Sequence, residues 1–182
     1  MTHDELQSVG KGIASSDESD QSEWTTLIEA KRKVLAELDG GVSCPCCGQF
    51  AKIYRRTITS QMAKGLIRFY RAASGAVGLP IVLADLFDHD RLYAVSAGKG
   101  GDFTKLVYWG LISEVPKPDT KDTRSSGVWQ LTEKGQRFVL CAEKVPKNAV
   151  VYDGQLIGLE GRMVSIRECL RSRFSYDELM SA

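Results

Sequence analysis

The chain has 182 residues, of which 43% are hydrophobic and 26% charged, and its formal net charge is +1 at pH 7. This composition is typical of a soluble globular protein with one well-packed core and small appendages. No apolar run approaches the roughly 20 residues of a membrane helix, and residues 1–5 lack the basic and apolar character of a signal sequence. We therefore expect a cytoplasmic protein without a membrane partner.

The first 22 residues are rich in Ser, Asp, Glu and Gly, which predicts a disordered acidic tail. Such a tail can screen a binding surface or imitate nucleic acid, or it can serve only to keep a terminus soluble. Both interpretations stay open. The acidic residues of segment 1–30, set against Lys11 alone, are Asp4, Glu5, Asp17, Glu18, Asp20, Glu23 and Glu29.

Segment 23–40 follows as a predicted short docking helix. Its apolar residues recur at helical spacing, and Asp39-Gly40-Gly41 is expected to end it. A basic patch, Lys31-Arg32-Lys33, lies inside the segment. The apolar residues are Trp24, Leu27, Ile28, Leu35 and Leu38.

Segment 41–57 is predicted to be a cysteine knuckle and a linker. Cys44 and Cys47, together with Pro45 and Gly48, resemble the Cys-Pro-x-Cys-Gly knuckle of zinc ribbons, which implies two thiolate ligands for zinc. The match is half a site, because no second Cys-x-x-Cys follows. Zinc would require distant donors or a second chain with its own pair; a turn with reduced thiols and a redox pair are the alternatives. The remaining thiols and imidazoles are Cys46, Cys141, Cys169, His3 and His89.

The stretch from Pro45 to Ala84 contains no acidic residue. Cations interleaved with aromatic residues are the composition expected of a surface that faces phosphates. A solvated helix face is the alternative. The cations are Lys52, Arg55, Arg56, Lys64, Arg68 and Arg71, and the aromatic residues are Tyr54, Phe69 and Tyr70.

Segment 58–141 contains three expected helices before a polar arm. The first covers 58–73, with Thr59 or Ser60 as its cap. Pro80 suits the first turn of a short second helix that runs to Phe87. A loop over 96–102 precedes the third helix, and its Gly98-Lys99-Gly100-Gly101 favours phosphate because free backbone N–H groups meet a helix start there.

The third helix is expected to end at Gly110 in a left-handed conformation. Its spacing divides it into a core face and an outer face. The residues expected to face the core are Phe103, Leu106, Val107, Gly110 and Leu111, and those expected on the outer face are Thr104, Lys105 and Tyr108.

Two predicted strands, at 111–112 and 128–131, enclose a polar, turn-rich arm, and Thr132 is expected to start a further helix. This order, with the match of 106–112 to Leu-x-x-x-Gly-Leu-Ile, resembles a winged helix-turn-helix domain over about residues 58–141. The loop at 96–102 is longer than the turn of that family. The resemblance implies double-stranded DNA as the partner, with the third helix in the major groove and the arm as a wing on phosphates. The candidate DNA-binding residues are Lys99, Thr104, Lys105, Tyr108, Lys117, Lys121, Arg124, Arg55, Arg56, Lys64 and Arg68.

Segment 142–182 is predicted to be a β-hairpin followed by helix. Asp153-Gly154 between strand-forming residues is a hairpin signal, and 165–170 and 174–180 read as helical turns. The unit is too small to fold alone, so we expect it to pack on the preceding domain or on another copy.

Catalytic motifs are missing from the sequence: it has no P-loop, no Gly-x-Ser-x-Gly and no His-Glu-x-x-His. We expect an α+β protein with a winged-helix core that binds DNA without catalysis, as a small regulator of transcription or an accessory factor. The alternative is a winged-helix module that binds a protein, for example a phage-like mobile-element protein that inhibits a host factor. Zinc is the one cofactor that the sequence suggests. A homodimer is a further expectation.

Overall fold

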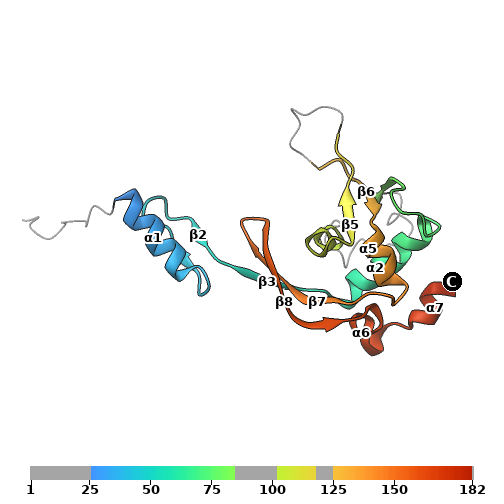
Figure 1. The fold of residues 1–182 in the computed structure, drawn as a ribbon. Helices are drawn as coiled ribbons and strands as arrows, with labels where there is room; N and C mark the ends of the chain where they lie inside the picture. Colours follow the sequence, from blue (N-terminus) through green and yellow to red (C-terminus); the bar gives the residue numbers. More distant parts are fainter. Residues whose placement is uncertain (1–25, 85–101, 118–124, 182) are drawn as a thin grey trace, which may run out of the picture. The chain divides into compact units, whose positions relative to one another are not determined.

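The computed structural model describes residues 26–84, 102–117 and 125–181, which form a mixed α+β structure with several small antiparallel sheets (Figure 1). The chain divides into two compact units, Met1–Ala51 and Lys52–Ala182. None of the helices in the described ranges is long and apolar enough to cross a membrane.

The first unit consists of a helix and a two-stranded hairpin. Helix α1 covers Leu27–Glu37, and Thr26 caps it through a reciprocal capping box with Glu29. Strand β1 (Val42–Ser43) pairs antiparallel with β2 (Phe50–Ala51). A helix is thus present in the segment predicted as 23–40, and it covers Leu27–Glu37. The buried apolar residues of this unit are Ala30, Leu38 and Val42.

The second unit is organised around α2 (Ser60–Ala72), which Thr59 caps as predicted. Its buried face includes Met62, Leu66 and Phe69. Around it pack η1 (Phe103–Trp109), α5 (Glu133–Val139), α6 (Ile166–Leu170) and α7 (Tyr176–Ser181) (Figure 1). A short 3-10 turn, η2 (Arg171–Arg173), joins α6 to the C-terminal segment.

One sheet of this unit has the order β4-β6-β5. Strand β4 is Ile81–Val82, β5 is Ile112–Glu114 and β6 is Val128–Leu131. The strands predicted on either side of the polar arm are therefore confirmed. The predicted cap of α5 is also confirmed, because the Thr132 hydroxyl accepts a hydrogen bond from the backbone N–H of Gly135.

The helix predicted from Pro80 is wrong in its first turn. Ile81 and Val82 pair with Trp129 and Val128, and helical backbone begins only at Leu83. Both residues are β-branched and suit an edge strand beside β6. The remainder of that predicted helix, and the loop at 96–102, lie outside the described residues apart from Asp102.

The third predicted helix forms, but as the 3-10 helix η1, and this changes its core face. Three residues per turn align Phe103, Leu106 and Trp109, all buried, whereas Val107 is 41% exposed. The expectation that Val107 faces the core is therefore wrong, since it assumed an α-helical period. Gly110 ends the helix with φ 67° and ψ 26°, as predicted.

The other sheet of the second unit has the order β3-β7-β8. Strand β3 is Tyr54–Thr57, β7 is Val145–Tyr152 and β8 is Gln155–Val164. The predicted hairpin is confirmed, and Asp153 and Gly154 both have positive φ at its turn. The segment predicted as knuckle and linker thus ends in a strand, and the C-terminal extension packs on the core around α2.

Candidate nucleic-acid interface and cysteine knuckle

The base of the polar arm is closed by Glu114. Its carboxylate accepts hydrogen bonds from the Ser125 hydroxyl, at 2.6 Å, and from the backbone N–H and hydroxyl of Ser126. These hydrogen bonds lower the pKa of Glu114 below its ordinary value, and the bond from the Ser125 hydroxyl contributes most. Lys117 is half-buried and adds a favourable charge interaction with Glu114. Lys121 and Arg124 lie outside the described residues.

The outer face of η1 is only partly accessible. Thr104, Lys105 and Tyr108 are each half-buried, and the Lys105 ammonium pairs with the carboxylate of Asp102 at the start of the helix. A phosphate or base would therefore share the Lys105 ammonium, which has three N–H donors, with that carboxylate. Lys99 lies outside the described residues.

The β7–β8 hairpin is joined to η1 by two hydrogen bonds. The Tyr108 hydroxyl donates to the carbonyl of Gly154, at 3.1 Å, and the Trp109 indole donates to the carbonyl of Pro146, at 2.7 Å. The hairpin was predictable from Asp153-Gly154, but its position beside η1 was not, because the bonds link residues 37 and 46 positions apart. The hairpin turn thus belongs to the surface that contains Tyr108.

The cations of α2 face the C-terminal segment. The Lys64 ammonium lies 4.9 Å from the centre of the Phe174 ring, and the Arg71 guanidinium donates to the carbonyl of Leu179. Arg68 is half-buried on the same helix. Lys64 and Arg68 therefore belong to a surface that α7 and its preceding turn partly cover.

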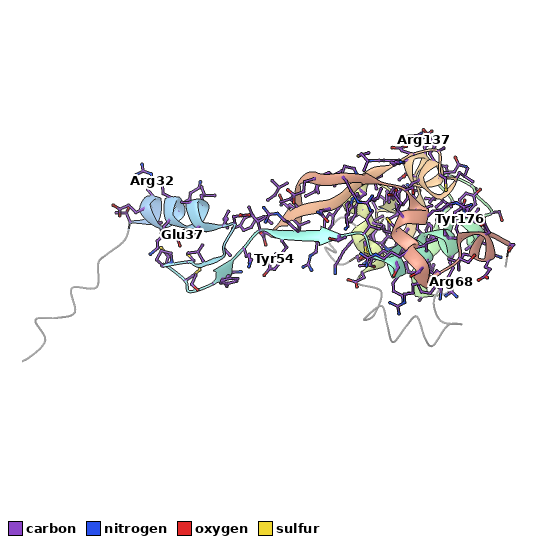
Figure 2. All side chains as sticks on the ribbon, turned by 90° about the horizontal axis from the view of Figure 1, so that it is seen from below. Arg32, Glu37, Tyr54, Arg68, Arg137 and Tyr176 are labelled. Carbon is purple, nitrogen blue, oxygen red and sulfur yellow. The ribbon has the colours of Figure 1, made fainter. Side chains whose placement is uncertain are left out.

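Arg55 and Arg56 lie on β3, the edge strand of its sheet. Arg55 forms an ion pair with Glu160 of β8 at 3.0 Å, and the Arg56 guanidinium lies 5.1 Å from the centre of the Tyr54 ring. Figure 2 shows Tyr54 and Arg68 well apart within the second unit. The acid-free stretch therefore supplies two separate groups of cations, one on β3 and one on α2, rather than a single basic surface.

The cysteine knuckle lies between β1 and β2. The backbone N–H of Cys44 donates to the Gln49 carbonyl and that of Gly48 to the Cys44 carbonyl, both at 2.8 Å, with Gly48 at φ 71°. The Cys44 sulfur accepts hydrogen bonds from the backbone of Cys47 and of Cys46 and interacts with both of their thiols, and these contacts lower the pKa of Cys44. Partial desolvation and the neighbouring Cys44 sulfur raise the pKa of Cys46.

These contacts favour the thiolate form of Cys44, and Cys47 stands at the two-residue spacing that a zinc knuckle uses for its second ligand. Within the described ranges no three His, Cys, Asp or Glu side chains are grouped closely enough to hold a metal ion. The knuckle therefore fits zinc as half of a ligand set. Cys141 and Cys169, the other described thiols, are exposed and buried respectively.

Comparison of the chain with protein-family models, with curated proteins and with solved structures found no significant match.

Proposed function

We propose that the chain is a non-catalytic double-stranded DNA-binding protein, a small regulator or accessory factor, built on a winged helix-turn-helix core. Two features carry the proposal: the three-stranded sheet with the order β4-β6-β5, and helix η1, which ends at Gly110 just before β5. The described elements follow in the order α2, β4, η1, β5, β6 and α5. The proposal assigns them the roles of first helix, strand, recognition helix, two wing strands and closing helix. That arrangement most often holds nucleic acid, although fold alone does not establish function.

In this proposal phosphate contacts come from the wing and from β3. The wing would use Lys117, Lys121 and Arg124, and β3 would use Arg55 and Arg56 beside the hairpin that contacts η1. Phosphate contacts position a protein on the duplex, whereas base edges specify sequence. Lys105 and Thr104 on η1, with Tyr108, are the candidates for base contacts.

A second function, docking of a protein partner, is supported by a separate observation. Leu156, Ile157 and Met163 of β8 are 43%, 57% and 51% exposed. Exposed apolar side chains on this strand, which lies at the edge of its sheet, suit a protein partner better than phosphates. The Asp102 carboxylate, which pairs with Lys105, also reduces the net positive charge at the start of η1.

A gel-shift experiment on mixed genomic duplex fragments tests the proposal. The full chain should retard a subset of fragments at low salt, and Lys105→Ala should weaken that binding by about 1 to 3 kcal/mol while leaving the unfolding transition unchanged. Lys144→Ala, which removes an exposed cation ahead of β7, is the charge-matched control and should bind as the wild type does. Equal affinity of Lys105→Ala and wild type would show that Lys105 of η1 does not contact DNA. If no fragment is retarded, docking of a protein partner becomes the favoured function.

A further inference from the structure

The cysteine knuckle presents two thiols from a rigid turn. Two backbone hydrogen bonds close the turn, between Cys44 and Gln49 and between Gly48 and Cys44, and Gly48 adopts the left-handed conformation that the turn requires. Cys44 and Cys47 are separated by two residues, the spacing at which one turn supplies two ligands to a tetrahedral zinc ion. Cys44 is half-buried and Cys47 is exposed.

Structural zinc takes four ligands in tetrahedral geometry. The knuckle supplies two of them, and the described residues contain no cluster with a third donor. A second copy of the chain carries the same pair on the same turn, so a two-fold axis through the metal would complete a four-thiolate site. Dimers with this two-fold symmetry are the commonest homo-oligomers.

The first unit also exposes four large apolar side chains, three on α1 and one on β2. Leu27, Ile28 and Leu35 of α1 are 78%, 66% and 58% exposed, and Phe50 of β2 is 57% exposed. Ile28 and Leu35 are seven residues apart and share a helix face. Phe50 pairs with Ser43, the residue before Cys44, so part of this surface lies next to the knuckle.

We propose that Cys44 and Cys47 form half of an intermolecular zinc site, that a second copy of this chain supplies the other two thiolates, and that the exposed apolar residues of the first unit pack in the resulting dimer. Each thiol releases its proton to solvent when it binds the metal. The dimer does not depend on the proposed DNA binding, because its ligands and apolar surface lie in the first unit.

The test measures metal content and mass of the full chain, purified without chelator in a reductant that does not bind zinc, and without nucleic acid. Elemental analysis should give one zinc per two chains, and light scattering should give the dimer mass. A chelator should produce monomer, and zinc added back should restore the dimer. One zinc per monomeric chain, protein without zinc, or a dimer that persists after chelation would each overturn the proposal.

Two variants separate ligand loss from misfolding. Cys47→Ser should lose both zinc and the dimer, whereas Cys46→Ser, the adjacent exposed thiol, should keep both. Trp109 and Trp129 are buried in the second unit. In a Trp24→Phe background, their fluorescence reports whether the remainder of the chain stays folded. Titration with cobalt should give a thiolate charge-transfer band that saturates at one cobalt per two chains, and saturation at one per chain would contradict the bridged site.

Discussion

Several charged side chains among the described residues of the second unit form ion pairs with one another. Lys105 pairs with Asp102, Arg55 with Glu160 and Arg167 with Asp177. Such exposed pairs contribute little to stability, with a median of about 0 to 1 kcal/mol. They matter here because the paired carboxylate offsets part of the positive charge that a phosphate would meet at the same cation.

Glu168 is the carboxylate with the strongest local stabilisation. The backbone N–H of Ser165 is the largest cause, followed by the Arg162 guanidinium at 2.6 Å and the Ser165 hydroxyl, and together they lower the pKa of Glu168 to about 2. A depressed pKa means that its contribution to stability is complete above the ordinary value of 4.5 and is lost as the pH falls towards 2.

Glu168→Gln should therefore reduce the acid dependence of unfolding. Between pH 4.5 and 2 the free energy of unfolding of the variant should fall less steeply than that of the wild type, measured by urea titration at each pH. The control is Glu178→Gln, which removes the same charge from an exposed site on α7 and should keep the wild-type slope. Parallel slopes for Glu168→Gln and wild type would contradict this role.

At the scale of elements, the sequence predicts best where the signal is local. The cap of α2 at Thr59, the left-handed Gly110, the cap of α5 at Thr132 and the turn at Asp153-Gly154 each depend on a few neighbouring residues. These features could all be predicted, because capping and turn preferences act over three or four residues.

Elements that depend on distant partners could not be predicted. Strand β4 exists because Ile81 and Val82 pair with residues nearly fifty positions later, and no local signal separates it from a helix start. The 3-10 geometry of η1 likewise buries Trp109 instead of Val107. The hydrogen bonds that place the β7–β8 hairpin beside η1 are also long-range, so this part of the candidate interface is visible only in the folded chain.

Gly135 of α5 lies close against the backbone of Leu111, the residue before β5. A Cβ at this position would lie 2.0 Å from the carbonyl oxygen of Leu111, whose backbone is held by the Thr132 N–H. Gly135→Ala should destabilise the protein by about 1 to 3 kcal/mol or more, because overpacking against fixed backbone outweighs the roughly 1 kcal/mol gain in helix propensity.

The midpoint of urea unfolding measures this effect. Gly158→Ala is the matched control, because a Cβ at Gly158 of β8 meets no atom within 4 Å. The midpoint should fall for Gly135→Ala and stay near the wild-type value for Gly158→Ala. A wild-type midpoint for Gly135→Ala would show that α5 moves away from Leu111 at little cost.

The cations of the proposed wing should contact phosphates and not the edges of bases. Replacing Lys117, Lys121 and Arg124 by Ala should lower the slope of log affinity against log salt by about one unit per lost contact. Replacing Lys31, Arg32 and Lys33 of α1 by Ala removes the same charge from exposed positions in the other unit and should leave the slope unchanged. An unchanged slope and affinity in the wing variant would assign the arm no role in binding.

At the scale of the whole molecule, a run of cations along the sequence did not become one surface. The stretch 45–84 crosses both units, and within the second unit it forms first an edge strand and then a helix with separate neighbours. Charge in a sequence window is one-dimensional information, whereas a phosphate-binding face needs cations adjacent in space. The candidate residues on β3, α2, η1 and the wing therefore have to be tested as separate groups.

The salt dependence of binding to a random-sequence duplex tests the central claim most directly, since counterion release makes phosphate-driven affinity fall steeply with salt while apolar docking barely changes. For the full chain, log affinity should decrease linearly with log salt, with a slope of about three or more if the wing cations and at least one further cation bind phosphates. A slope near zero, or no binding at low salt, would contradict the proposal that this protein binds DNA.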